Sequence, residues 1–201
     1  MADEPLLERL VQGAEVYRGG FLRVRRDTVQ LPDGSHTERE YVVHPGAVVI
    51  IPVLGDAGDQ RVILERQFRY PVRQVIVEFP AGKIDPGEPP LACAQRELRE
   101  ETGYSAAEWA RAGQLHPLVA YSDEAIDIWL ARGLRAGARQ LDQGEFLEVI
   151  EAPVAQLMHW CRSGTVTDAK TIIGAFWLQQ WLSGQWQPAW QSAGAAVEQA
   201  R

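Results

Sequence analysis

The feature that most constrains the fold is a run of seven residues without a polar side chain, AVVIIPV at positions 47–53. A strand with one solvated face alternates apolar and polar residues, whereas a strand covered on both faces is apolar throughout. The run therefore predicts a buried central strand with other elements packed on each side of its sheet. Two more segments with strand-like composition follow it, RVILERQF at 61–68 and QVIVEF at 74–79.

The remaining segments predict helices and strands around this centre, and hence an α/β fold. Strands are expected over residues 15–31 and 38–43, 125–130 and 146–150, with a loop at 134–145. Helices are expected over residues 90–102, 153–162 and 169–182. We divide the chain into an N-terminal β-sheet segment (1–43), a main domain (44–184) and a C-terminal tail (185–201).

Three carboxylates fall within one turn of the first expected helix. Glu97, Glu100 and Glu101 stand at positions i, i+3 and i+4, so the helix places them on one face. Like charges this close repel each other and require compensation. Either Arg96 and Arg99 relieve a solvated face, or the face binds a hard divalent cation, which takes carboxylate oxygens as ligands.

The residues around this face decide between the two interpretations. From Gly82 the sequence is GKIDPGEPPLACAQRELREETGY, and its fixed positions are Gly82, Glu88, Arg96, Glu97, Leu98, Glu100, Glu101, Gly103 and Tyr104. With average residue usage, chance produces this spacing in roughly one chain in a million. The motif resembles the signature of the Nudix hydrolases. The resemblance implies an α/β/α sandwich with a mixed sheet, here preceded by a small N-terminal antiparallel β-sheet.

The resemblance also implies roles for the parts of the motif. It implies a divalent cation, Mg²⁺ with Mn²⁺ as the alternative, bound by the Ala81 carbonyl, Glu97, Glu100 and Glu101. The last two are also expected to take part in catalysis, because bound ions bridge a diphosphate and activate a water. Glu88 is expected to reach back to Arg96 and hold the loop on the helix. Gly82 and Gly87 are expected to let that loop turn tightly.

The residues before and after the signature narrow the substrate class. The run EFPAG at 78–82 resembles that of the ADP-ribose pyrophosphatase and nucleotide-sugar branch, and the similarity covers about residues 40–182. We therefore expect Mg²⁺-dependent hydrolysis of ADP-ribose to AMP and ribose 5-phosphate. Val119-Ala120 stands where ADP-ribose enzymes usually carry Pro-Gly, which leaves GDP-mannose or another nucleoside-diphosphate sugar as an alternative. A third possible function is a non-catalytic Nudix-fold nucleotide-binding module. The full set of metal ligands argues against this function, because a protein that only binds nucleotide does not need it.

Glu145 is the candidate general base. It lies in the GEFLEV segment, where relatives of this branch place an acidic loop, and a carboxylate near bound metal accepts a proton from the attacking water. The alternative is that Glu145 is an acidic residue of a surface loop without a catalytic role. Asp142 is a weaker candidate for the general base.

Four further residues are candidates for binding substrate. Arg69 either presents its guanidinium to the phosphates or forms an ordinary surface ion pair. Glu78 either contacts a substrate base or pairs with Arg69. Ser122 and Glu124, in the YSDE segment that resembles the same branch, are expected to contact substrate.

Charge and composition argue against several other functional classes and cellular locations. The net charge of −7 argues against nucleic-acid binding, which requires clustered Lys and Arg. The opening residues are acidic, and no 18 consecutive residues are apolar, so we expect neither export nor a membrane. Cys93 and Cys161 form no disulfide or zinc pattern, which favours the cytoplasm. The resemblance further implies a homodimer completed by the N-terminal sheet.

Overall fold

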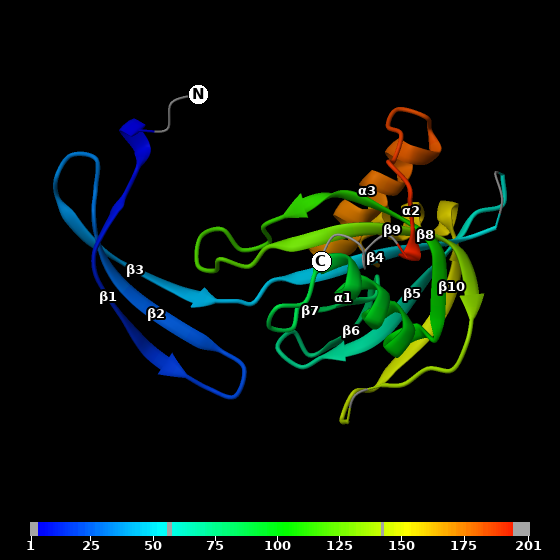
Figure 1. The fold of residues 1–201 in the computed structure, drawn as a ribbon, viewed down its shortest axis with the longest axis horizontal. Helices are drawn as coiled ribbons and strands as arrows, with labels where there is room; N and C mark the ends of the chain where they lie inside the picture. Colours follow the sequence, from blue (N-terminus) through cyan, green and yellow to red (C-terminus); the bar gives the residue numbers. More distant parts are fainter. Residues whose placement is uncertain (1–3, 56–57, 142, 195–201) are drawn as a thin grey trace. The chain divides into compact units, whose positions relative to one another are not determined.

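The computed structural model describes residues 4–55, 58–141 and 143–194, and the chain divides into two compact units (Figure 1). The first unit comprises Met1–Pro45 and His116–Ala125, and the second Gly46–Leu115 and Ile126–Arg201. The first unit thus combines the N-terminal segment with a stretch that the sequence assigned to the main domain. Among the described residues, no helix has the length and apolar character needed to cross a membrane.

The first unit is built on a three-stranded antiparallel sheet, with order β1-β2-β3. The strands are β1 (Arg9–Arg18), β2 (Arg23–Gln30) and β3 (His36–Val43), preceded by a short 3₁₀ turn at Glu4–Leu6. The single strand predicted over 15–31 is therefore wrong: two strands meet at a turn closed by a hydrogen bond from the Gly19 amide to the Leu22 carbonyl (2.8 Å). The Gly19-Gly20 pair breaks the strand, because glycine favours turns.

The second unit contains an eight-stranded mixed sheet. Its order is β10-β5-β4-β9-β8-β11, with β6 paired to β5 and β7 paired to β4. The strands are β4 (Ala47–Leu54), β5 (Arg61–Arg69), β6 (Gln74–Glu78), β7 (Ala81–Lys83), β8 (Tyr104–Leu115), β9 (Ile126–Ala136), β10 (Leu147–Pro153) and β11 (Gln191–Ser192). Only the β4–β9 pair is parallel, and β4 runs antiparallel to β5 and β7. The predicted mixed sheet is confirmed.

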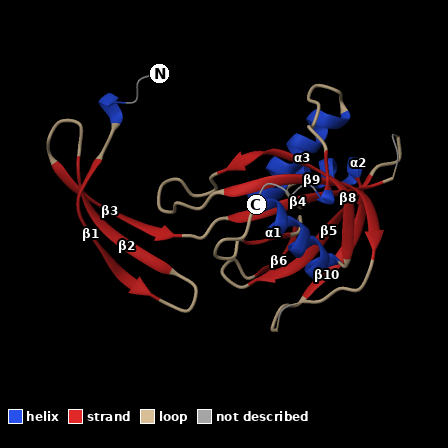
Figure 2. Ribbon diagram, viewed as in Figure 1, coloured by secondary structure: helices blue, strands red, loops and turns tan. Residues whose placement is uncertain are grey.

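Helices cover both faces of this sheet, as Figure 2 shows in blue against the red strands. They are α1 (Pro90–Glu97), which continues as a π-helical turn η2 (Leu98–Thr102), α2 (Val154–Ser163) and α3 (Ala169–Leu182). On β4, Val48 and Ile50 pack in one cluster with the buried residues of α1. Val49, Ile51 and Val53 pack in the other with those of α2 and α3. Both faces of the AVVIIPV strand are covered, which confirms the α/β/α sandwich.

Strands β7, β8 and β11 of the sheet were not predicted from the sequence. The twelve residues of β8, YSAAEWARAGQL, contain two aromatic residues but no Val, Ile or Thr, and four alanines and a glycine, so their composition carries only a weak strand signal. Pairing with β9 along its length holds β8 extended, with a register shift between Arg111 and Gly113. The same pairing extends β9 to Ala136, so the loop predicted over 134–145 begins three residues too early. The three-residue strand β7 is too short to read from its composition.

The described part of the C-terminal segment packs against the second unit. Trp186 lies edge-on to Trp177 and Trp190 to Trp181, with ring centroids 5.0 and 5.1 Å apart. Strand β11 pairs with β8, and the guanidinium of Arg132 stacks 4.0 Å from the centre of the Trp190 ring. These contacts attach residues 185–194 to the sheet.

Candidate metal and substrate site

The signature residues extend from β7 through the following loop, helix α1 and the π-helical turn η2 to the start of β8. Helix α1 begins at Pro90, whose missing amide hydrogen would have no partner in the first turn. The π-helical turn ends at Gly103, which adopts a left-handed φ of 79°. Such turns inside a helix are frequent at functional sites. The continuous helix predicted over 90–102 is thus present, but its last turn is wider than an α-helix.

Arg96 fastens the signature loop to the helix. Its Nε and Nη2 each donate a hydrogen bond of 2.9 Å to one oxygen of Glu88. This fork-shaped ion pair lowers the pKa of Glu88 to about 2. The structural role predicted for Glu88 is confirmed.

The same guanidinium also gathers two of the three signature carboxylates. Arg96 Nη1 donates to Glu97 Oε1 (2.8 Å) and to Glu100 Oε2 (3.0 Å). Glu101 binds elsewhere: its Oε2 accepts a hydrogen bond of 3.0 Å from the amide of Ala81, and the residue is 5% exposed. The helix therefore presents Glu97 and Glu100 beside Arg96, and directs Glu101 at the strand that carries Ala81.

Gly82 is required for a different reason from the one predicted. It lies in β7 with no positive φ, and a Cβ atom there would overlap the carboxylate of Glu97. The prediction that Gly82 serves a tight turn is wrong, because its need is the close approach of Glu97. Gly87 does adopt a left-handed φ of 79° and provides the turn.

The site is strongly acidic and partly buried. Burial raises the pKa of Glu97, against the opposing hydrogen bond from Arg96. Burial, followed by the charges of Glu65, Glu97 and Glu145, also raises the pKa of Glu101. When Glu97 and Glu101 are ionised, the neighbouring residues therefore do not fully compensate their negative charge.

These donors fit a hard divalent cation, because all of them are oxygens. Over the ranges that the structure describes, no three His, Cys, Asp or Glu side chains already converge as a finished metal cage. Arg96 pairs with one oxygen of Glu97 and one oxygen of Glu100. A bound cation would supply the charge that draws them together.

One acidic residue of the site escaped sequence analysis. Glu65 lies on β5, is 2% exposed, and its Oε1 has no hydrogen-bond partner among the described residues. Burial, then the charges of Glu78 and Glu145, raise its pKa. The sequence signal for Glu65 was a charged residue within a segment expected to form a strand of the buried sheet. Its position near the signature, however, follows only from the fold.

Arg69 and Glu78 form the ion pair that sequence analysis left open. Arg69 Nε donates to Glu78 Oε1 at 2.7 Å, and Lys170 Nζ donates to Glu78 Oε2 at 2.5 Å. Lys170 also pairs with Asp168 at 3.0 Å. Glu78 is 2% exposed, so its charge is matched inside the protein. Lys170, on a distant helix, could not be assigned from the sequence.

A hydrogen-bond chain ties this ion pair to the start of α3. The Oδ2 atom of Asp168 accepts hydrogen bonds from the amide and the hydroxyl of Thr171, at 2.9 and 2.6 Å. The Thr171 hydroxyl in turn accepts from the amide of Phe79 at 2.9 Å. The N-terminus of α3 thereby fixes the EFPAG segment that leads into the signature.

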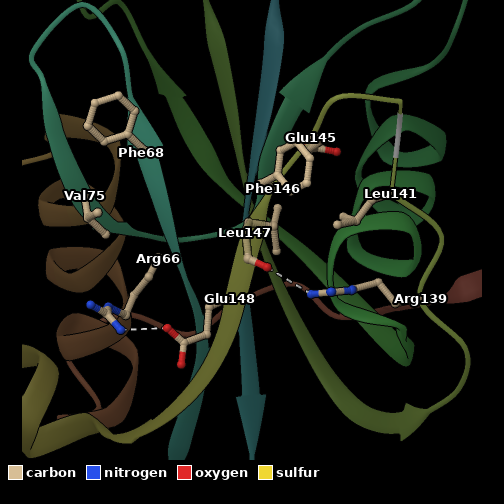
Figure 3. A pocket seen from close by; sticks show the side chains of 9 residues that line it. All are labelled: Arg66, Phe68, Val75, Arg139, Leu141, Glu145, Phe146, Leu147 and Glu148. Atoms are coloured by element: carbon tan, nitrogen blue, oxygen red, sulfur yellow. Dashed lines mark hydrogen bonds and ion pairs between the residues drawn. The ribbon is translucent and has the colours of Figure 1, made fainter.

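Glu145 lies in a pocket of about 370 Å³, shown in Figure 3. Phe68 on β5 and the exposed Phe146 contribute aromatic rings to its lining, and Arg66 and Arg139 contribute guanidinium groups. The charge of Glu145 acts on Glu65, Glu97 and Glu101, which places it near the acidic site. Asp142, the weaker candidate for the base, lies outside the described residues.

Ser122 and Glu124 belong to the first unit, and their contacts there are local. The Ser122 hydroxyl accepts a hydrogen bond of 3.2 Å from the amide of Glu124. The carboxylate of Glu124 lies 3.7 Å from Nε2 of His44. Ser122 also bridges to Val42 at the end of β3. Their expected contact with substrate stays a prediction.

Comparison with known proteins identifies the family of the chain. The model of the NUDIX domain matches residues 43–172, more than half of the sequence. The chain belongs to the Nudix hydrolase family. Nudix hydrolases generally use divalent metal ions, in agreement with the oxygen donors of the site. A second model, the nucleoside diphosphate sugar hydrolase N-terminal domain, matches residues 8–42.

The similar Nudix proteins include an ADP-ribose pyrophosphatase from Bacillus subtilis (strain 168), 36% identical over 87% of this chain and 94% of its own length. A methanol dehydrogenase activator from Bacillus methanolicus is 34% identical over 86% of this chain and 92% of its own. Among solved structures, an ADP compounds hydrolase superposes with a TM-score of 0.78 at 25% identity, covering 89% of this chain and 95% of that one. These matches span nearly the whole Nudix chain.

Proposed function

We propose that this Nudix hydrolase cleaves the pyrophosphate bond of ADP-ribose, giving AMP and ribose 5-phosphate, with Mg²⁺ as its cofactor and Mn²⁺ as a substitute. The observation that carries the proposal is the complete set of signature carboxylates on one helical turn, Glu97, Glu100 and Glu101. Similarity to the Bacillus subtilis ADP-ribose pyrophosphatase along most of the chain supports the choice of substrate.

The metal would be held by Glu97, Glu100, Glu101 and the carbonyl of Ala81. When bound, a divalent cation neutralises phosphate charge and lowers the pKa of a coordinated water. Arg96 would orient two of these ligands, because it donates hydrogen bonds to Glu97 and Glu100. It also binds Glu88 and so holds the signature loop against the helix.

The protein's own groups manage the proton and the phosphate charge. In the proposed reaction, a water oxygen forms a bond to one phosphorus, and the bond from that phosphorus to the bridging oxygen breaks. The other phosphate leaves with the bridging oxygen, and Glu145 accepts the proton of the water. Arg69 binds the phosphates, because Nε alone contacts Glu78 and its guanidinium is partly exposed.

We assign three other residues to substrate recognition. Glu78 positions Arg69 and, as a residue of the EFPAG segment, lies beside the substrate. Ser122 and Glu124 contribute from the segment joined to β3. Because Val119-Ala120 replaces the Pro-Gly usual in ADP-ribose enzymes, another nucleoside-diphosphate sugar such as GDP-mannose is the alternative substrate. A non-catalytic nucleotide-binding module is the remaining alternative.

The test is product analysis after incubating the purified protein and Mg²⁺ separately with ADP-ribose, GDP-mannose, ADP-glucose and NADH. We expect ADP-ribose to be consumed fastest and to yield AMP. Faster cleavage of GDP-mannose or ADP-glucose would retain the chemistry and overturn the substrate. No cleavage of any compound would favour the binding module.

A homodimer is part of the same proposal. Strand β1 is an edge of its sheet and all ten of its residues are exposed, including Leu10, Val11, Val16 and Tyr17. Exposed apolar edge strands favour association. We propose a second copy of this chain as the occupant, and the cytoplasm as its compartment, since Cys93 and Cys161 are free thiols.

A further inference from the structure

Glu65 is a buried carboxylate that forms no ion pair with the described residues. It lies in the middle of β5, opposite Glu78 on β6 and Val149 on β10, and is 2% exposed. Its Oε1 accepts no hydrogen bond from the described residues. Buried polar atoms are nearly always satisfied, and an unmatched buried carboxylate is costly. Packing alone does not explain an acid at this position.

The cations of the neighbourhood are already engaged by another carboxylate. Arg69 and Lys170 both bind Glu78, the cross-strand partner of Glu65. Their charges act to lower the pKa of Glu65, but burial and the charges of Glu78 and Glu145 have larger effects and raise it. No described lysine or arginine forms an ion pair with Glu65 itself. Among the described residues, the nearby cations Arg69 and Lys170 are therefore bound by Glu78 and not by Glu65.

The neighbours of Glu65 lead to the signature from two sides. On one side its partner Glu78 precedes Ala81 in the EFPAG segment, and the amide of Ala81 donates to Glu101. On the other side β10, which pairs with Glu65 at Val149, contacts η2. Strand β5 thus carries Glu65 on the side of the sheet, while α1 and η2 carry the signature carboxylates on the helix side. Converging carboxylates with an unpartnered buried oxygen are the donor set that a hard divalent cation takes.

We propose that Glu65 is a further carboxylate of the divalent-cation site, lying outside the signature and contributing charge that holds the ion beside Glu101. The inference rests on the proposed metal-dependent function and adds a residue from the sheet to a site otherwise built on β7 and the helix.

The test measures metal binding without substrate. Wild-type protein and Glu65→Gln are stripped of metal and titrated with Mn²⁺ alone, and free Mn²⁺ is followed by electron paramagnetic resonance. The amide keeps the shape of the side chain and removes its charge. We expect Mn²⁺ to bind the variant about tenfold or more weakly. The thermal unfolding midpoint of the metal-free variant should equal or exceed that of the wild type, because a buried repulsion has been removed.

The matched control is Glu148→Gln. This residue lies on β10, and its side chain is 62% exposed and paired with Arg66. It makes the same charge change at the surface, so Mn²⁺ affinity should change by less than about twofold. Glu65→Leu serves as a second variant if Glu65→Gln does not fold. An affinity within twofold of wild type in a folded Glu65 variant overturns the proposal.

The outcomes separate this inference from the proposed function. If Mn²⁺ binding weakens in Glu65→Gln while the wild type hydrolyses none of the nucleotides, the proposed reaction is wrong and the cation site stands. If the wild type cleaves ADP-ribose and Glu65→Gln binds Mn²⁺ normally, the reaction stands and Glu65 has no part in the site.

Discussion

At the scale of single residues, the position of the Glu97 carboxylate depends on the missing side chain of Gly82. Gly82 supplies room for the Glu97 carboxylate, which passes over its α-carbon where a Cβ would stand. We expect Gly82→Ala to displace Glu97 and weaken Mn²⁺ binding by about tenfold or more, as measured by titration of the metal-free protein.

Gly87→Ala is the control for this substitution. Gly87 has a left-handed φ of 79° and open space around its missing side chain. Alanine there should lower the free energy of unfolding by about 1 kcal/mol through backbone strain, with little effect on Mn²⁺ affinity. Equal Mn²⁺ affinity in Gly82→Ala and wild type would contradict the role given to Gly82.

The Glu88–Arg96 ion pair predicts a pH dependence of stability. Arg96 lowers the folded-state pKa of Glu88 to about 2, below an unfolded value of about 4.3. The pair therefore stabilises the protein above pH 4.3, and this contribution disappears as pH falls from about 4.3 to 2. At pH 6, Glu88→Gln should lower the free energy of unfolding by roughly 1–3 kcal/mol.

Denaturant unfolding of wild type and Glu88→Gln at several pH values checks this expectation. The difference between the two proteins should be largest near neutral pH and shrink towards pH 2. A difference that stays constant across this range would mean that the ionised carboxylate of Glu88 contributes nothing.

At the scale of elements, the N-terminus of α3 holds the segment before the signature. The Thr171 hydroxyl accepts from the Phe79 amide and donates to Asp168. Thr171→Val keeps the shape but leaves a buried amide without its partner, so the free energy of unfolding should fall by about 1–3 kcal/mol. Denaturant unfolding measures this loss. Thr165→Val, at an exposed position, is the control, and an equal loss in both variants would contradict the tie.

Elements with their own periodicity could be predicted from the sequence. Helix α3 spans Ala169–Leu182 as expected, because an Asp168 cap and a long apolar segment define it locally. Strand β8 could not be predicted, since its residues are strand-forming only through their pairing with β9. The turn inside 15–31 was missed although two adjacent glycines mark it.

The same distinction holds for the site. The grouping of Glu97, Glu100 and Glu101 follows from spacing along one helix, and the Glu88 contact follows from the motif. Lys170 and Glu65 reach the site from elements far away in the sequence, so only the fold reveals them. The contact of Arg96 with Glu88 was predicted. Its contacts with Glu97 and Glu100 correspond to the charge relief that was one of the two interpretations of the carboxylate face.

At the scale of the whole molecule, the proposed dimer makes a prediction about mass. Wild-type protein should sediment at about twice the chain mass of 22.4 kDa. The double variant Leu10→Asp, Val11→Asp puts two charges on the exposed strand β1 and should sediment as a monomer. Phe176→Asp, an equivalent change on α3 at a residue 53% exposed, should remain dimeric. Sedimentation of the wild-type protein as a monomer would contradict the proposed dimer.

The central claim is that a cation held by the signature carboxylates enables hydrolysis of ADP-ribose. The direct measurement is AMP release from ADP-ribose with Mg²⁺ by wild type and Glu101→Gln, with circular dichroism to verify the fold. We predict rapid release by the wild type and a rate lower by a factor on the order of a hundred or more in the variant. Equal rates in two folded proteins would contradict the assignment of the metal site.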